Sequence, residues 1–394
     1  MFYNISFSVG ILTTPQLHFI VRCINDSKYG VPSEEGYYEK ISQAFVSLTN
    51  AFKSKIAVVN VDGANGVGAL KMTEMAKHLQ GLLPINVFND GSNGELNENC
   101  GADHVKVVQK CPEGLLLKGG EKCASFDGDA DRIVYFYHDS SGVFHLLDGD
   151  KISTLIASYL KGKLEEAGLH LSRGLGVVQT AYANGSSTAY VEEVLKVPVA
   201  CVKTGVKHLH KKAHDFDIGV YFEANGHGTV LFSEDFKSTL SKALIDSSLS
   251  LTKKAASQEL DSAMNVINET VGDAMSDMLL VEAILCKKQW SLNDWDSCYQ
   301  DLPNRQRKVR VNDRTVITTT DAERKTTTPK GLQEEIDKLV AGYKKGRSFV
   351  RPSGTEDVVR VYAEAETQKE ADDLALAVSE KVFDLAGGLG ARPT

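Results

Sequence analysis

The sequence predicts an α/β protein built from several modules, and three observations support this class. The chain has 394 residues, which at roughly 100 to 200 residues per domain is enough for two to four domains. From about residue 35 onward, apolar runs of strand length alternate with stretches of helical periodicity. Hydrophobic residues make up 42% of the chain and charged residues 24%, which is ordinary for a globular protein. We expect two mixed α/β sheet domains followed by a C-terminal α+β domain.

The first module, residues 35–147, opens with an amphipathic pattern and continues with short apolar runs. A glycine turn at 63–66 separates the first predicted strand from the helix that follows it. The expected helices are 36–52 and 64–80, and the expected strands are 56–62, 85–90, 122–127 and 133–139.

The second module, residues 148–297, alternates the two patterns again and closes with a long helical region ending near Trp295. Its helices are predicted at 151–168 and 187–196, and its strands at 174–180, 198–204 and, as a pair around a polar turn, within 218–232. The third module, residues 298–394, is predicted to contain strands 308–313, 315–321, 348–352 and 358–366, with helices 332–346 and 368–388.

Charge and cysteine usage exclude several classes of protein. Lys and Arg total 44 against 52 Asp and Glu, so a formal charge of -8 disfavours a nucleic-acid partner. The N-terminal stretch has no basic segment and no uncharged run near the ~18 apolar residues of a spanning helix, so we expect neither a signal peptide nor a membrane span. The seven cysteines are scattered and form no C-x-x-C pair, which indicates a reducing, cytoplasmic compartment. Oligomeric state is not readable from this pattern.

The segment FDGDADR carries carboxylates at Asp127, Asp129 and Asp131. Residues spaced by two face different sides of a helix, whereas a turning loop can bring all three together. Crowded carboxylates repel one another, and a hard divalent cation removes that repulsion; Mg²⁺ suits a site with few protein ligands. Small Gly128 and Ala130 allow the backbone to turn tightly.

The same segment has three other interpretations. A calcium EF-hand needs glycine at position six and glutamate at position twelve of the loop, where this chain has Arg132 and His138, so that interpretation fails. An aspartyl-nucleophile phosphatase, with Asp127 attacking phosphorus, stays open as an alternative. So does a plain acidic surface turn balanced by Arg132.

A second polar loop, EANGHG, lies between two apolar runs and carries Glu223, Asn225 and His227. A carboxylate can accept from two vicinal hydroxyls, and the amide and imidazole can each donate or accept, which suits a sugar. A plain hairpin turn is the alternative.

A third loop, RPSGTEDVVR, gathers Arg351, Ser353, Gly354, Thr355 and Arg360 between two strands. Guanidinium groups match phosphate oxygens, hydroxyls add donors, and a glycine lets backbone N–H groups turn toward an anion. The loop lacks the G-K-[ST] ending of a nucleotide P-loop. The pattern predicts a phosphate site, and a surface turn with incidental arginines is the alternative.

A basic loop, KTGVKHLHKK, follows another apolar run. Thr204 is placed to cap a helix whose N-terminus attracts phosphate, with Lys207 or His208 near the reacting group. An exposed basic helix face is the alternative, while Cys201 and the nearby histidines lack the spacing of a zinc site.

In the order FDGDADR, KTGVKHLH, EANGHG and RPSGTEDVVR, these loops resemble the phosphohexomutase superfamily, and within it most closely the eukaryotic phosphoacetylglucosamine mutase family. The likeness includes LTTPQLH, FNDGSNG, GVVQTAYANGSST, LPNRQ and TTTDAERK, and it covers nearly the whole chain from about Gly10. The resemblance implies a phosphohexomutase-like fold and the interconversion of N-acetylglucosamine 6-phosphate and 1-phosphate, on the route to UDP-N-acetylglucosamine.

The resemblance also implies residue roles. Mg²⁺ would be bound by Asp127, Asp129 and Asp131, with Lys207, His208 and Arg132 supporting the transfer. The sugar would be held by Glu223, Asn225 and His227. The phosphate that is not transferred would be held by Arg351, Ser353, Gly354, Thr355 and Arg360. A phosphoserine would donate its phosphoryl group, and the bisphosphorylated sugar would then reorient and return the other phosphate.

The chain departs from that family in one respect. Family members have four domains, with the nucleophile in a Thr-Ala-Ser-His-Asn loop of the first, and this sequence has no such segment. We expect residues 1–34 to be a remnant of that domain, followed by a metal-binding domain at 35–147, a sugar-binding domain at 148–297 and a phosphate-binding domain at 298–394. Ser186 and Ser187 are not expected to replace the nucleophile. The polypeptide is therefore predicted to bind sugar phosphate weakly and to turn over little; the alternative is a non-catalytic sugar-phosphate-binding or regulatory form.

Overall fold

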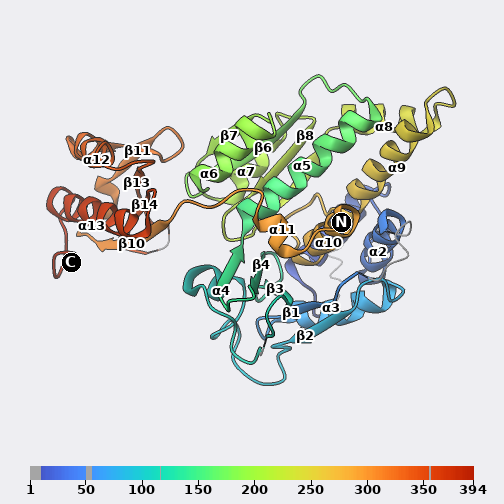
Figure 1. Ribbon diagram of the computed structural model, residues 1–394, viewed down its shortest axis with the longest axis horizontal. Coiled ribbons are helices and arrows are strands. Elements are labelled where there is room, and N and C mark those ends of the chain that lie inside the picture. The colour runs from blue at the N-terminus through green and yellow to red at the C-terminus, as the bar shows by residue number, and fades with distance from the viewer. Residues whose placement is uncertain (1–9, 50–55, 116, 355) are drawn as a thin grey trace, which may run out of the picture. The chain divides into compact units, whose positions relative to one another are not determined.

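The computed structural model describes residues 10–49, 56–115, 117–354 and 356–394 (Figure 1). By its internal contacts the chain divides into two compact units, each built from two segments of the sequence. The first unit comprises Met1–Leu175 and His214–Cys298, and the second comprises Gly176–Ala213 and Tyr299–Thr394. The boundaries expected at about residues 35, 148 and 298 are not tested by this division and stay predictions.

A five-stranded mixed sheet with the order β2-β1-β3-β4-β5 lies in the first unit. The first three strands in that order are parallel, and β4 and β5 are antiparallel to their neighbours. β1 and most of β3 are buried along their length, as is usual for parallel strands inside a covered sheet, although both contain polar residues. The strands are β1 Val59–Asp62, β2 Ile85–Phe88, β3 Lys122–Phe126, β4 Ile133–His138 and β5 Phe144–Leu147.

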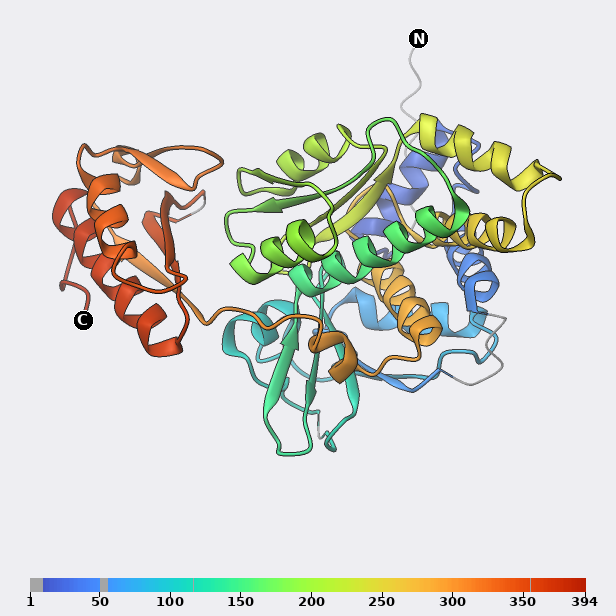
Figure 2. The same cartoon turned by 45° about the horizontal axis from the view of Figure 1, so that its top comes forward.

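Helices and one further hairpin complete the first unit. α2, α9 and α10 pack against one another in both views (Figures 1 and 2). Every residue of α10 from Ala274 to Leu285 is buried, as expected for a helix that is apolar nearly all round. The helices are α1 Thr14–Asn25, α2 Glu34–Thr49, α3 Val67–His78, α4 Ala102–Val108, α5 Gly149–Ala167, α8 Glu234–Ile245, α9 Leu251–Val266, α10 Ala274–Lys288 and α11 Leu292–Asp296. The hairpin pairs β8 Ile218–Phe222 with β9 Gly228–Phe232.

The second unit begins with a parallel strand pair and its connecting helical turns. These elements are β6 Leu175–Thr180, α6 Gly185–Ala189, a π-helical turn Tyr190–Val194, β7 Val199–Val202 and α7 Val206–Ala213. Its C-terminal part has an antiparallel sheet of order β10-β14-β13 and a separate hairpin of β11 and β12. α12 and α13 cover one face of the sheet and share a core that includes Leu332, Val350 and Leu374. These elements are β10 Asn304–Arg310, a 3₁₀ turn Arg314–Val316, β11 Thr318–Thr320, β12 Lys325–Thr328, α12 Leu332–Val340, β13 Arg347–Pro352, β14 Val358–Glu364 and α13 Gln368–Leu385.

The mixed α/β class is confirmed, and the differences from the predicted elements have local causes. The helix predicted at 332–346 ends at Val340, two residues before Gly342, where glycine disfavours its continuation. α1, α4, β5 and β12 were not predicted as elements, and the tail of the helix predicted at 36–52 falls outside the described residues. All seven cysteines are free thiols. Among the described helices, none combines the length and apolar character needed to cross a membrane.

Candidate functional site

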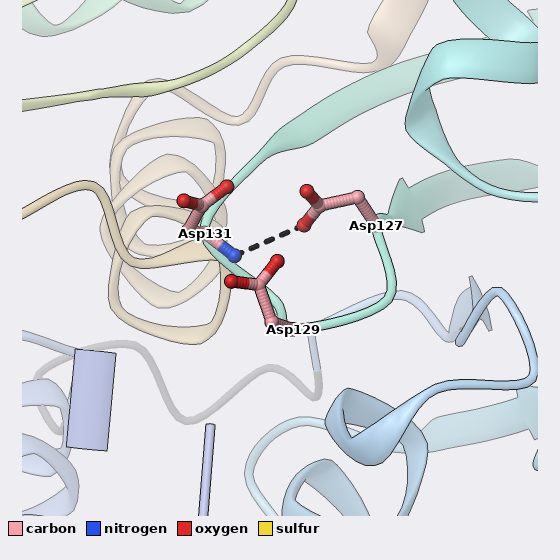
Figure 3. A group of neighbouring side chains, drawn as sticks. All are labelled: Asp127, Asp129 and Asp131. Carbon is pink, nitrogen blue, oxygen red and sulfur yellow. Dashed lines mark hydrogen bonds between the residues drawn. The ribbon is translucent and has the colours of Figure 1, made fainter. Parts of the chain in front are cut away.

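The loop between β3 and β4 brings its three carboxylates together (Figure 3). One oxygen from each of Asp127, Asp129 and Asp131 lies within 4.8 Å of the others. The loop is closed by Asp127 Oδ1, which accepts the backbone N–H groups of Asp131 at 3.0 Å and Arg132 at 3.1 Å. Ala130 adopts a left-handed φ of 59°, so the turn itself is strained for a residue with a side chain.

The metal loop, residues 127–131, is held by the N-termini of three helices. The first residue of each helix donates its backbone N–H to one of three consecutive loop carbonyls: Val67 of α3 to Gly128 at 3.0 Å, Thr14 of α1 to Asp129 at 3.2 Å, and Ala274 of α10 to Ala130 at 3.0 Å. Helix N-termini carry unpaired N–H groups and a partial positive charge. The loop carbonyls satisfy those donors, and the positive ends offset part of the carboxylate charge.

The close approach of α3 to the metal loop depends on Gly66. A Cβ built on Gly66, the residue before α3, would lie 2.3 Å from the carbonyl oxygen of Gly128. Any larger side chain would push the helix away from the metal loop, and the hydrogen bond from Val67 would be lost.

Thr14 makes a further contact that sequence inspection missed. Its Oγ1 donates to Asp129 Oδ2 at 2.6 Å, so the hydroxyl orients one of the candidate ligands. The start of α1 is rigid because Thr13 and Gln16 form a reciprocal capping box and proline follows within the first turn. That T-x-x-Q signal was present in LTTPQLH, although nothing local pointed to Asp129.

The electrostatics of the metal loop favour a cation. Burial, together with the charges of Asp131 and Asp129, raises the pKa of Asp127 to about 8. Arg132 offsets part of this repulsion: its guanidinium pairs with Asp103 at 2.8 Å and lies 3.6 Å from both Asp127 and Asp131. Asp131 Oδ1 is buried without a hydrogen-bond partner among the described residues. Oxygen donors of this kind fit Mg²⁺.

The sugar loop, residues 223–227, joins β8 to β9 and packs against the metal loop. Gly226 has a φ of 90°, and a Cβ there would lie 1.9 Å from the carbonyl oxygen of Ile133. The Ile133 N–H donates to the Gly226 carbonyl at 3.2 Å. His227 is buried with its Nδ1 3.2 Å from Asp131 Oδ2, and its Nε2 has no hydrogen-bond partner among the described residues. Within the first unit His227 therefore joins the two loops, and its predicted contact with sugar stays a prediction.

Glu223 and Asn225 take different parts in that loop. The backbone carbonyl of Glu223 accepts the N–H of Gly226, and the Glu223 N–H donates to the His227 carbonyl, both at 2.9 Å. These two backbone bonds fix a tight turn. Asn225 Oδ1 accepts the His227 N–H at 3.1 Å. Both side chains are half-buried on this rigid turn.

The phosphate loop lies in the second unit, at the end of the β13–β14 hairpin. Arg351 and Arg360 are direct partners across the two strands, so two cations lie side by side. Ser353 is buried and donates its N–H to the Val358 carbonyl at 2.9 Å, and Gly354 is exposed with open space around it. Thr355, also predicted to hold phosphate, lies outside the described residues.

Counter-charges accompany both arginines of that loop. Arg360 pairs with Glu356 at 2.8 Å, and Arg351 pairs with Glu323 at 3.1 Å. Glu323 was not among the predicted site residues. It belongs to the TTTDAERK segment, where it follows polar threonines and has no local pattern that marks it.

The basic loop is also in the second unit. Lys207 is exposed and His208 half-buried in the first turn of α7. The helix begins at Val206, two residues after Thr204, and the Thr204 hydroxyl donates to Glu323. Ser187 is buried and accepts a hydrogen bond from Gln179 Nε2 at 3.0 Å, which agrees with the expectation that it carries no phosphoryl group.

Comparison with known proteins gives three family matches. Residues 28–134 match the model described as phosphoacetylglucosamine mutase AMG1, domain II, and residues 148–290 match domain III of the same family. Residues 308–381 match the C-terminal domain of phosphoglucomutase/phosphomannomutase.

Relatives and solved structures agree with these matches. The chain is 58% identical over 388 residues to phosphoacetylglucosamine mutase of Homo sapiens, covering 98% of this chain and 71% of that protein. It is similar to the Aspergillus fumigatus N-acetylphosphoglucosamine mutase solved in complex with GlcNAc-6P and magnesium, with a TM-score of 0.89 and 49% identity over 94% of this chain and 75% of that one. An N-acetylglucosamine-phosphate mutase in its product complex gives a TM-score of 0.90 with 47% identity, covering 95% and 70% of the two chains.

Proposed function

The chain belongs to the phosphoacetylglucosamine mutase family of the phosphohexomutases, and from this premise we propose that its loops serve the interconversion of N-acetylglucosamine 6-phosphate and 1-phosphate. The observation that carries the proposal is the convergence of Asp127, Asp129 and Asp131 on a loop that three helix N-termini support. A ligand cluster built this rigidly suits phosphoryl transfer, where catalysis consists largely of positioning and charge stabilisation.

Asp127, Asp129 and Asp131 would hold Mg²⁺. When bound, the ion acts as a Lewis acid that stabilises charge on the oxygens of the moving phosphoryl group. Arg132, held by Asp103, keeps a positive charge beside the cluster. Asp127 Oδ1 already accepts two backbone N–H groups, which favours a fixed ligand over the nucleophile of a phosphatase.

The other loops would bind the substrate. Glu223 and Asn225 offer a carboxylate and an amide to sugar hydroxyls, and His227 is placed to add a third polar group. Arg351, Ser353, Gly354, Thr355 and Arg360 would hold the phosphate that is not transferred, and Lys207 and His208 would support the transfer with positive charge. The cross-strand pairing of Arg351 with Arg360 supports this role, since one anion can contact both guanidinium groups.

The phosphoryl donor is not supplied by a recognisable segment of these 394 residues, which contain no Thr-Ala-Ser-His-Asn sequence. We therefore propose that this polypeptide, tested as it stands, binds the sugar phosphate weakly and converts little of it. The same observation favours, as a second candidate, a non-catalytic sugar-phosphate-binding or regulatory form. The seven free cysteines support the cytoplasmic location that the sequence predicts.

Calorimetry tests whether the chain binds the sugar phosphate, and a conversion assay tests separately whether it turns the sugar phosphate over. N-acetylglucosamine 6-phosphate is titrated into the chain with Mg²⁺ present, and into Glu223→Gln with Asp90→Asn as an exposed control. We expect binding by the wild type and the control, and binding at least about tenfold weaker in Glu223→Gln. No binding by the wild type would end the proposed function. Sustained conversion by protein primed with glucose 1,6-bisphosphate would end only the claim of low turnover.

A further inference from the structure

We propose that Glu323 is a positioning residue for the phosphate loop: it fixes the guanidinium of Arg351 and links it to Thr204, which precedes the basic helix α7. The inference rests on the proposed function, because it assigns a role in sugar-phosphate binding. All three residues belong to the second unit.

One carboxylate oxygen makes the link. Glu323 Oε2 accepts the backbone N–H of Thr204 at 2.9 Å and its hydroxyl at 2.6 Å. The same oxygen lies 3.1 Å from Arg351 Nε, and the two charged side chains are only 12% and 13% exposed. An ion pair so withdrawn from water is much less screened than a surface pair, so its geometry is strongly enforced.

The backbone around Glu323 is strained to reach this position. Asp321, Ala322 and Glu323 have φ values of 50°, 54° and 69°, in the left-handed region that residues with side chains rarely adopt. Three such residues in succession join β11 to β12, and each costs of order 1 kcal/mol or more. The turn keeps this conformation because contacts hold it, and the bonds from Glu323 to Thr204 are among them.

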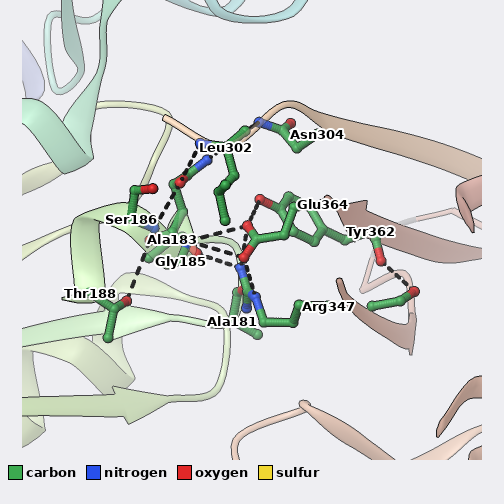
Figure 4. A network of polar contacts seen from close by, with 12 residues as sticks. Ala181, Ala183, Gly185, Ser186, Thr188, Leu302, Asn304, Arg347, Tyr362 and Glu364 are labelled. Carbon is green, nitrogen blue, oxygen red and sulfur yellow. Dashed lines mark hydrogen bonds and ion pairs between the residues drawn. The ribbon is translucent and has the colours of Figure 1, made fainter. Parts of the chain in front are cut away.

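Arg351 also lies near Tyr182, whose ring centroid is 6.0 Å from the guanidinium carbon. The backbone next to Tyr182 is held by the contacts of Arg347 that Figure 4 shows. Arg347 pairs with Glu364 through two bonds of 2.8 and 3.0 Å and donates to the carbonyls of Ala181 at 2.8 Å and Ala183 at 2.6 Å, on either side of Tyr182.

The guanidinium group of an arginine offers five N–H donors in one plane. The Glu323 carboxylate holds the guanidinium by charge at Nε, without a hydrogen bond from the Nε–H, and leaves the terminal nitrogens for a bidentate contact with phosphate. Glu323 therefore orients Arg351 before the anion arrives. If Glu323 merely occupied the place of the phosphate, its removal would strengthen anion binding; positioning predicts the reverse.

The test measures binding of N-acetylglucosamine 6-phosphate to the full 394-residue chain by calorimetry. Glu323→Gln keeps an oxygen acceptor for Thr204 and removes the charge, while Glu323→Ala removes both. We expect affinity to fall about tenfold in the first and further in the second, because Arg351 loses the buried counter-charge that holds it in place. The control is Glu366→Gln, which removes a surface pair with Lys344 and is expected to change nothing. Unchanged or tighter binding in both Glu323 variants would overturn the proposal.

A second measurement separates this inference from the proposed function. The ¹⁵N resonance of Arg351 Nε–H, assigned by its loss in Arg351→Lys, is followed in the free protein. We expect it to be protected from solvent exchange in the wild type and in Glu366→Gln, and to exchange faster in Glu323→Gln and Thr204→Val. If the wild type bound no sugar phosphate, the proposed function would fail while this signal still decided whether Glu323 holds Arg351. Equal exchange in all variants would reject the positioning role.

Discussion

The hydroxyl of Thr14 donates to Asp129 Oδ2 at 2.6 Å, joining the first turn of α1 to a carboxylate 115 residues away. The same residue donates its N–H to the Asp129 carbonyl, so both the side chain and the backbone of this candidate ligand are held by one threonine. Mutation of a group that orients a metal ligand typically lowers metal affinity by about 10- to 100-fold.

Replacing Thr14 with valine is therefore expected to weaken divalent-cation affinity about tenfold, because Asp129 loses the bond that orients it. Thr14→Ser, which keeps the hydroxyl, should bind nearly as well as the wild type. Thr73→Val is the matched control, since its hydroxyl donates to the Ala69 carbonyl on an exposed face of α3. Calorimetry with Mg²⁺ measures all three, and equal affinity of Thr14→Val and wild type would contradict the orienting role.

Gly226→Ala is expected to destabilise the first unit by about 2 kcal/mol or more. The new Cβ would lie 1.9 Å from the Ile133 carbonyl oxygen, and the φ of 90° is unfavourable for alanine. Gly81→Ala separates the two effects, because Gly81 has a φ of 72° with nothing within 4 Å of its added Cβ. Urea unfolding should show the larger loss for Gly226→Ala; similar losses in both variants would mean that the contact between the sugar loop and the first residue of β4 is not tight.

Removing the guanidinium of Arg347 is expected to cost about 3 kcal/mol or more of stability. Glu364 is 1% exposed, and Arg347→Met leaves its carboxylate buried without a counter-charge. Arg305→Met is the control, because the pair of Arg305 with Asp372 lies at the surface and is worth at most about 1 kcal/mol. Denaturant unfolding of both variants measures the difference, and a double variant Arg347→Met, Glu364→Leu should recover part of the loss.

Lys40 gives a pH dependence whose sign can be stated. Burial lowers its pKa from 10.5 to about 8, although its ammonium donates to the Tyr29 carbonyl at 2.9 Å. Below pH 8 Lys40 carries its proton in both the folded and the unfolded state. Between pH 8 and 10.5 the unfolded state binds more of this proton, so the contribution of Lys40 to stability rises with pH in that window.

Lys40→Met should flatten this rise, and Lys28→Met, at an exposed position, should leave it unchanged. Chemical denaturation at pH 7 and pH 10 compares the variants with the wild type. A change in stability between the two pH values that is the same in Lys40→Met as in the wild type would contradict this role of Lys40.

Local patterns were enough to predict most elements and the positions of the four loops. Helical periodicity located α5 and α13, and apolar runs located β1, β6 and β8, because burial of one face or of both faces leaves a mark in the sequence. β12 could not be predicted, because its residues, KTTT, are mostly exposed and show no alternation of apolar and polar side chains. The spacing of Asp127, Asp129 and Asp131 predicted their convergence, since a turning loop acts over five residues.

Contacts between distant segments could not be predicted in this way. Thr14 meets Asp129 across 115 residues, and Glu323 meets Thr204 across 119. No pattern in the sequence around these residues indicates either contact, because tertiary packing and not local conformation creates it. His227 shows the same limit: its residue type indicated a polar ligand, yet only the fold places it against Asp131.

Electron paramagnetic resonance of Mn²⁺ tests the metal loop most directly, because bound and free ions are counted without any need for turnover. The account predicts one site per chain that Mg²⁺ competes for and that is lost in Asp129→Asn, with Asp90→Asn unchanged. A chain that binds no Mn²⁺, or an Asp129→Asn variant that binds it as well as the wild type, would contradict the assignment of the three aspartates.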